Sequence, residues 1–118
     1  MIEHYYNDVC SYPLSFRTAL EGLGLVQGDI NDIVIWIKAN ADDETFVRRK
    51  SILEGDFTLQ NNTIALSLDE SDFGTEEDKL QEGESYFICF KLFDTDGQPI
   101  KKHLKNIELS ILPQEVRE

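Results

Sequence analysis

Basic residues and long apolar runs are both scarce in this 118-residue chain. Eleven lysines and arginines stand against 23 aspartates and glutamates, a formal net charge of −12 at pH 7. Phosphates would repel such a chain, so we expect no nucleic-acid partner and no membrane-surface partner. No stretch approaches the roughly 20 apolar residues that span a bilayer. Glu3 and Asp8 stand where a signal peptide would be basic and then apolar, which predicts a chain that stays in the cytoplasm on synthesis.

Cysteine is equally rare, and Cys10 and Cys89 are the only two. An immunoglobulin-type disulfide would need a tryptophan about a dozen residues after the first cysteine, and Trp36 lies too far along the chain. We therefore expect two reduced thiols. Cys89 lies inside an apolar run, which favours a packing role over a nucleophile.

Residues typical of catalytic or cofactor sites are also few. The two histidines, His4 and His103, have no metal-ligand spacing with each other or with the cysteines. The glycines of EGLGLVQG lack the lysine and the spacing of a phosphate-binding loop. A Cys89–His103 pair across a hairpin would need a lowered thiol pKa, which a buried strand position does not provide. We therefore expect a protein that is not an enzyme, with no metal and no cofactor.

The segment DTDG, Asp94 to Gly97, raises the question of a calcium loop. An EF-hand loop with Gly97 at its sixth position would have Leu92 at the first, where an oxygen ligand is required. A tight corner after a strand fits better, because Gly97 can adopt a positive φ and Asp94 can accept bonds from backbone amides. For the acidic stretches ADDET and DESDFGTEED, solvated loops are the simpler interpretation, and weak calcium binding stays open.

Two-residue alternation of apolar side chains is the strongest pattern in the chain. Residues 85–93 (SYFICFKLF) are apolar on both faces, which is typical of a strand in the middle of a sheet and covered on both sides. Residues 106–112 and 62–68 alternate apolar with polar and predict half-buried strands. Residues 32–38 (DIVIWIK) are rich in β-branched residues and predict another strand. Trp36 lies in this strand between two isoleucines, and we therefore expect its side chain to belong to the core.

Polar turns separate these strands, and closely spaced strands with polar turns favour an antiparallel sandwich or barrel. At this length the chain is most simply one domain. The sequence therefore predicts a single all-β, mostly antiparallel domain over residues 1–118, with at most one or two short helical turns. We expect residues 1–13 and 113–118 to be less ordered.

Three segments allow more than one interpretation. Residues 14–25 fit a strand or a short helix, and we favour a strand with a kink, because each of the two glycines weakens a helix by about 1 kcal/mol. Residues 42–53 fit a capped helix or an edge strand, and we favour the edge strand, since charged residues on an edge discourage stray pairing. Residues 68–80 are too acidic for a strand and predict a connection with one helical turn begun by Asp69 or Ser71.

Four motifs follow one another along about two thirds of the chain. QGDINDIVIWIK is a Gly-Asp corner followed by an apolar strand, and NNTIALSLDESDF is a strand that ends in an acidic turn. LQEGESYFICFKLFDTDGQ has a Leu, Gly and Tyr entry to a strand and a glycine turn after it, and KHLKNIELSI is a last strand. In this order they resemble the small immunoglobulin-like domains of phage tails and baseplates, in particular the N-terminal domain of baseplate upper proteins and related short prophage proteins.

The resemblance implies an immunoglobulin-like β-sandwich with a structural role. It implies a non-catalytic assembly module of a phage or prophage tail or baseplate, a virion component that docks to other virion subunits or to copies of itself as a homo-oligomer. The segments DDETFVRRKS and GTEED and the first two dozen residues depart from the family pattern. The alternative function is a small ligand- or carbohydrate-binding sandwich with an aromatic platform drawn from Tyr5, Tyr6, Tyr12 or Trp36.

Six of the eleven basic residues gather in two clusters. On a chain this acidic, such clusters are either solvated strand faces or a patch that meets acidic surfaces of a neighbouring protein. The candidate interaction patch consists of Arg48, Arg49, Lys50, Lys101, Lys102 and Lys105.

Overall fold

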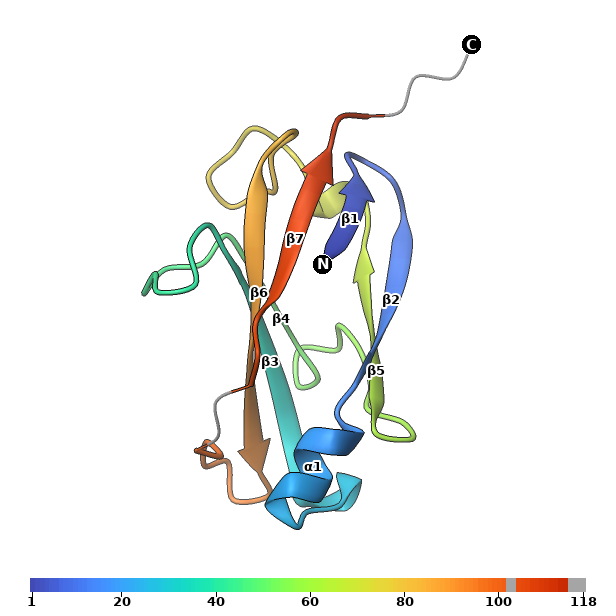
Figure 1. The fold of residues 1–118 in the computed structure, drawn as a ribbon, viewed down its shortest axis with the longest axis vertical. Helices are drawn as coiled ribbons and strands as arrows, with labels where there is room; N and C mark the ends of the chain where they lie inside the picture. The colour runs from blue at the N-terminus through green and yellow to red at the C-terminus, as the bar shows by residue number, and fades with distance from the viewer. Residues whose placement is uncertain (102–103, 115–118) are drawn as a thin grey trace.

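The computed structural model describes residues 1–101 and 104–114, which form two β-sheets, a short helix and two 3-10 turns (Figure 1). The larger sheet has the strand order β1-β7-β6-β3-β4, and β2 pairs with β5 in the smaller one. In chain order the elements are β1 (Ile2–Tyr5), β2 (Cys10–Ser15), α1 (Arg17–Leu23), η1 (Gln27–Asp29), β3 (Ile30–Lys38), β4 (Arg48–Ser51), β5 (Thr63–Leu68), η2 (Glu70–Asp72), β6 (Ser85–Asp94) and β7 (Ile107–Leu112).

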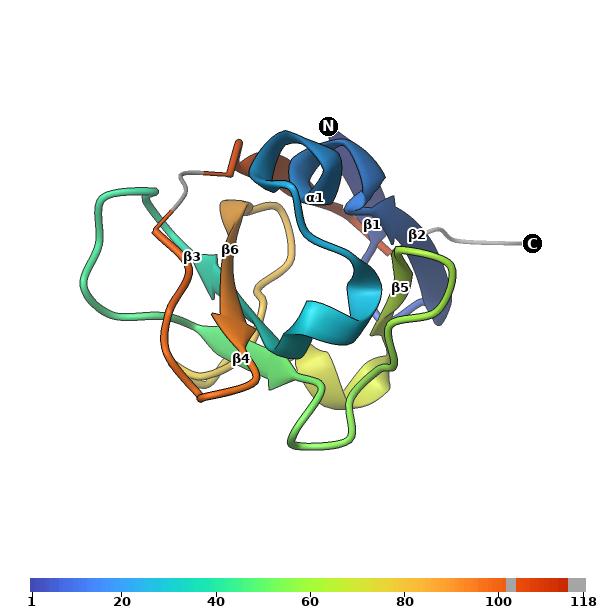
Figure 2. The same ribbon diagram turned by 90° about the horizontal axis from the view of Figure 1, so that it is seen from below.

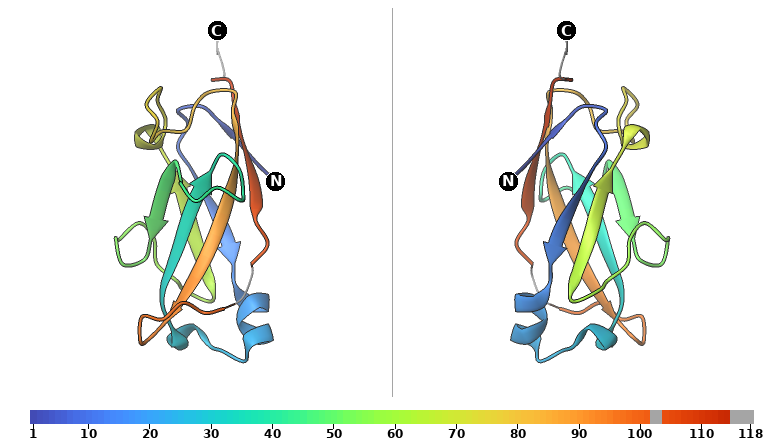
Figure 3. Two further views of the ribbon diagram at one scale, coloured as in Figure 1. Left: turned by 90° about the vertical axis from the view of Figure 1, so that its left-hand side faces the viewer. Right: turned by 90° about the vertical axis from the view of Figure 1, so that its right-hand side faces the viewer.

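Among the strands of the described residues, every pair except one is antiparallel. β1 runs parallel to β7, with Ile2 opposite Leu109 and His4 opposite Ile111, so the larger sheet is mixed. The side views show the two sheets as separate layers (Figure 3). The expectation of a mostly β, mostly antiparallel fold is thus confirmed. No helix in the described ranges is long and apolar enough to cross a membrane.

One hydrophobic core fills the space between the two sheets. Seen along the strands, α1 and η1 lie at one end of this core (Figure 2). Most of the strand residues predicted to face inward are deeply buried, which confirms the alternation found in the sequence. The exceptions are Ile107, which is only half-buried, and Val34, which was predicted on the other face of its strand and is also buried. The residues predicted to face inward and exposed by 2% or less are Ile33, Ile35, Ile37, Ile64, Leu66, Leu68, Ile88, Leu92, Leu109 and Ile111.

The strand favoured over residues 14–25 is wrong beyond Ser15, where β2 ends and α1 follows. Leu20 N donates to Phe16 O at 2.9 Å, and both side chains are buried on one side of the helix, as the i, i+4 spacing requires. Gly24 ends the helix with φ +70°, a conformation that favours glycine. The glycines therefore shorten the helix instead of preventing it, because tertiary burial decides the conformation of so short a segment.

The other two ambiguous segments follow the sequence prediction at least in part. The edge strand favoured over residues 42–53 is present only as β4, Arg48–Ser51, at the edge of the larger sheet. Asp69 caps η2, and its Oδ1 accepts a bond from Ser71 N at 2.9 Å. Hydrogen bonds from the Ser71 hydroxyl and then from its amide lower the pKa of Asp69. The acidic connection thus contains the single helical turn that was expected.

The DTDG segment is a corner at the end of β6. Gly97 has φ +77°, and Asp94 Oδ1 accepts bonds from Asp96 N at 3.0 Å and Gln98 N at 2.9 Å. Ile100 N then donates to Leu92 O at 2.8 Å, so the chain returns alongside β6. These contacts confirm the strand corner.

The first thirteen residues contain β1 and the first four residues of β2, although no strand was expected there. Buried His4 holds this region together. Its Nε2 lies 2.8 Å from Asp8 O, its Nδ1 lies 2.6 Å from the Tyr12 hydroxyl, and its ring stacks on Phe73. Because the inward position of β1 holds a histidine, residues 2–5 do not show an alternation of apolar with polar side chains. The sequence pattern therefore did not predict β1. Of the tail expected at 113–118, residues 115–118 lie outside the described residues.

Candidate functional site

The outer side of the larger sheet is only partly covered, since the smaller sheet packs on the opposite side (Figure 3). Val34 and Ser51, opposite one another on β3 and β4, are buried on this outer side, whereas Trp36 and Cys89 are half-buried. β6 lies in the middle of this sheet, as predicted. The prediction that both faces of β6 are covered is wrong, because its outward residues are only half-buried. These are Phe87, Cys89, Lys91 and Phe93. The sheet therefore presents a partly apolar surface.

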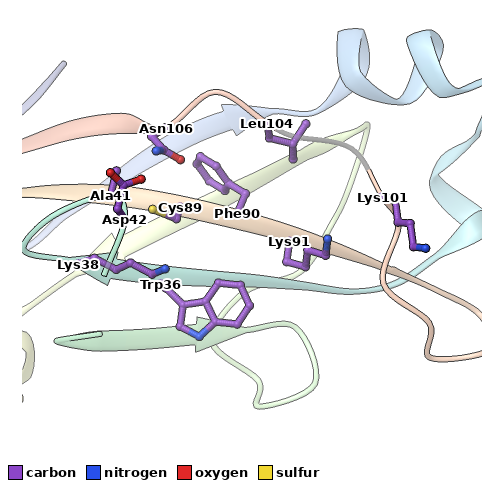
Figure 4. A pocket seen from close by; sticks show the side chains of 10 residues that line it. All are labelled: Trp36, Lys38, Ala41, Asp42, Cys89, Phe90, Lys91, Lys101, Leu104 and Asn106. Atoms are coloured by element: carbon purple, nitrogen blue, oxygen red, sulfur yellow. The ribbon is translucent and has the colours of Figure 1, made fainter. Parts of the chain in front are cut away.

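A groove lies on this outer side between two loops (Figure 4). Trp36 on β3 is opposite Cys89 on β6, and together they form part of its floor. Its walls come from the loop after β3 and from the segment before β7. We call this cavity of about 450 Å³ the outer-face groove, and it is lined by Trp36, Lys38, Ala41, Asp42, Cys89, Phe90, Lys91, Lys101, Leu104 and Asn106.

Positive charge dominates the outer-face groove. Lys38, Lys91 and Lys101 line it, together with one carboxylate, Asp42. Lys38 Nζ donates to the main-chain oxygen of Asp43 at 2.9 Å, a neutral group that leaves the lysine charge uncompensated. None of the three lysines belongs to an ion pair found within the described part of the chain. The groove is thus a basic site on a chain with a net charge of −12.

Trp36 lies on the floor of the groove, so the expectation that it belongs to the core is wrong. Ile35 and Ile37 turn inward and are fully buried, and the alternation of β3 therefore sends Trp36 outward, where it is half-buried. The sequence contained this signal, because Trp36 shares its strand face with Lys38.

Both cysteines are free, as predicted. Cys89 points to the outer side of the sheet and Cys10 is exposed at the start of β2, so the two thiols cannot meet through the core. Burial raises the pKa of the Cys89 thiol, and the charge of Lys38 opposes this only in part. At neutral pH Cys89 is therefore a protonated thiol, which suits packing and not nucleophilic attack.

We expect Cys10 to be alkylated by iodoacetamide at least about tenfold faster than Cys89 in the folded protein. The thiolate is the reacting form, and the half-buried position of Cys89 shields its thiol and disfavours its thiolate, whereas Cys10 is exposed. Peptide mapping by mass spectrometry over time measures the two rates. In urea the rates should converge, which serves as the control. Equal rates in the folded chain would contradict the placement of Cys89.

The three residues of the first basic cluster, Arg48 to Lys50, do not share one face of β4 in the structure. Arg48 and Lys50 turn inward from β4 and bind the fully buried Asp72, with Arg48 Nη2 at 2.8 Å and Lys50 Nζ at 3.1 Å from its carboxylate. Arg49 turns to the outer side opposite Trp36 and pairs with Glu54. Two of the three cations therefore bind a buried carboxylate and stabilise the fold instead of forming an exposed patch.

The second basic cluster lies partly beside the groove. Lys101 lines it, and Lys105 is exposed on the segment before β7. Lys102 lies outside the described residues. The prediction omitted Lys38 and Lys91, which complete the basic groove. The sequence contained only a weak indication of their position. By the alternation of their strands, Lys38 shares a face with Trp36 and Lys91 shares a face with Cys89.

No metal centre is formed by the residues in the ranges 1–101 and 104–114, because no three His, Cys, Asp or Glu side chains gather closely enough. Comparisons with protein-family models, with curated proteins and with solved structures found no match to this chain. Its function must therefore be argued from the groove and from the fold.

Proposed function

We propose that this chain is a non-catalytic structural module of a phage or prophage tail or baseplate, which docks to other virion subunits. The observation that supports docking is the outer-face groove, where a tryptophan and three lysines line an uncovered part of the larger sheet. Tryptophan is enriched among the few residues that carry most of the binding free energy of protein interfaces. The excess of lysine suits a partner with acidic side chains.

The distribution of strands supports an immunoglobulin-like assignment within this proposal. In immunoglobulin domains, strands B and E share one sheet, while strands C, C′, F and G share the other. Here β2 and β5 share one sheet, and β3, β4, β6 and β7 share the other, in the same chain order. β1 adds a strand beside β7. The outward Trp36 and the two free thiols separate this chain from antibody domains.

Purified particles provide the test of this proposal. An epitope-tagged chain would be expressed in the host that encodes it, particle production induced, and gradient-purified particles probed by immunoblot. We expect the chain in tailed particles, and at least about tenfold less of it after Trp36→Ala, which removes the aromatic floor of the groove. Arg17→Ala, an exposed change on α1 away from the groove, is the matched control. Particles that lack the unmodified chain would refute the proposal.

A small ligand- or carbohydrate-binding role is the second candidate. The half-buried ring of Trp36 favours it, because ligand pockets combine aromatic walls with a few polar groups, and Asp42 and Asn106 supply such groups here. The candidate tyrosines lie elsewhere. Tyr12 contacts His4 and Tyr6 packs on Phe73, so neither lines the groove.

Fluorescence separates the two roles, since Trp36 is the only tryptophan and lies in the groove. For a docking module, we expect no saturable change in emission when neutral mono- and oligosaccharides are added. The Trp36→Phe variant supplies the background signal. A saturable shift with one sugar would favour the second role over docking.

A further inference from the structure

The charges of the outer-face groove point to a second copy of this chain as its occupant. We propose that the groove of one copy binds the acidic loop of another, residues 75–78 (TEED). This inference deepens the proposed function and depends on it only for the choice of the groove as docking site. The contact joins two different surfaces, so it is heterologous and can repeat from copy to copy.

The acidic loop presents three carboxylates to solvent. Glu76, Glu77 and Asp78 are exposed, in the connection between η2 and β6 at the upper end of the molecule in Figure 1. The next residue, Lys79, donates to Ser71 O and so is held by a main-chain oxygen. No ion pair in the described part of the chain includes the three carboxylates. Their charge is therefore available to a partner.

The groove and the loop are complementary. The groove has three lysines and one carboxylate, a local charge of +2 (3 − 1), while the loop has three carboxylates. Lysine stems can pack along Trp36 while their ammonium groups reach the carboxylates of the loop. None of the residues that line the groove belongs to the loop, so a loop that fills the groove comes from another copy.

Overall charge sets the conditions under which this contact forms. Two copies with a net charge of −12 each repel one another at long range. At an ionic strength of about 0.1 M the screening length is about 10 Å, which weakens the repulsion between distant charges and retains attraction at contact. At about 1 M the screening length is about 3 Å, and the contact should also be lost.

Sedimentation velocity over a concentration series tests self-association. At about 0.1 M salt we expect the average mass of the unmodified chain to rise with concentration. At about 1 M salt we expect a monomer at the same concentrations. A chain that stays monomeric throughout the series at about 0.1 M salt overturns the inference.

Two variants test which surfaces meet. Lys91→Glu alters the groove, and Glu76→Gln combined with Glu77→Gln removes two of the three carboxylates of the loop. We expect each to weaken association at least about tenfold. The matched controls are Arg17→Glu, and Glu3→Gln combined with Glu21→Gln, all exposed and outside both surfaces; they should associate like the unmodified chain. Circular dichroism checks folding, and Lys91→Met, which keeps the apolar stem, replaces Lys91→Glu if that variant unfolds.

Mixing the groove variant with the loop variant gives the sharpest result. The groove variant retains an intact loop, and the loop variant retains an intact groove. An equimolar mixture should therefore form 1:1 dimers that do not grow further. Association that persists in both variants, or a mixture that contains only monomers, overturns the inference. A monomeric chain found in purified particles would overturn this inference alone, whereas a self-associating chain absent from particles would overturn only the proposed function.

Discussion

Substitution of alanine for Asp72 is expected to lower the free energy of unfolding by about 3 kcal/mol. The Asp72 side chain is fully buried, and its carboxylate binds Arg48 and Lys50 and accepts a bond from Asp69 N at 3.0 Å. Removal of the Asp72 carboxylate leaves Arg48 and Lys50, on the inner side of β4, without a negatively charged partner. Arg48 keeps 24% of its side-chain surface in solvent, so we place the effect at the lower end of the range for broken buried pairs.

Urea unfolding followed by far-ultraviolet circular dichroism measures this loss. The control Asp78→Ala removes an exposed carboxylate nearby and should change the free energy by less than about 0.5 kcal/mol. Replacing all three partners by apolar residues (Arg48→Met, Lys50→Met, Asp72→Leu) should restore most of the stability, because that change leaves no buried charge behind. A loss below about 1 kcal/mol in Asp72→Ala would show that the cluster is not desolvated.

Ile35→Ala is expected to lower the free energy of unfolding by about 3–4 kcal/mol. Ile35 has no exposed surface and lies on β3 between Lys50 of β4 and Phe90 of β6. Strands on both sides fix the backbone here, so the surrounding residues can fill the cavity only in part, and the cavity adds to the lost transfer free energy.

The measurement for Ile35 is the shift of the urea midpoint at unchanged slope. Ile35→Val removes one methylene and should lose about 0.5–1.5 kcal/mol, which gives a graded series at one position. Leu53→Ala, at a side chain that is 68% exposed, should have little effect. Equal losses for Ile35→Ala and Leu53→Ala would contradict the assignment of Ile35 to the core.

The strands that could be predicted are those whose buried faces are aliphatic. β3, β5, β6 and β7 alternate clearly, and local pattern and tertiary burial agree there. β1 and β2 lack that signal because their inward positions include His4 and Tyr12, which become suitable for burial only when they contact each other. The helix α1 was missed because its glycine content outweighed the spacing of Phe16 and Leu20 in our interpretation.

The candidate site was harder to predict than the fold, because it depends on loops and on distant partners. The RRK cluster looks uniformly basic in the sequence, yet two of its members face Asp72, a residue more than twenty positions away. The walls of the groove come from two segments with no periodic pattern. The alternation of side chains along β3 and β6 places Lys38 and Lys91 on the same side as Trp36 and Cys89. This alternation was the only feature of the sequence from which their place in the groove could have been predicted.

The parallel pairing of β1 with β7 has a consequence for the order of assembly. Ile2 meets Leu109, so β1 leaves the ribosome long before β7 and has no partner until nearly the whole of this sequence has been made. Pairings this distant in sequence form slowly, and unpaired strands are exposed to aggregation until they form. A nascent chain stalled before β7 would therefore display β1 as an unpaired strand, to which chaperones could bind.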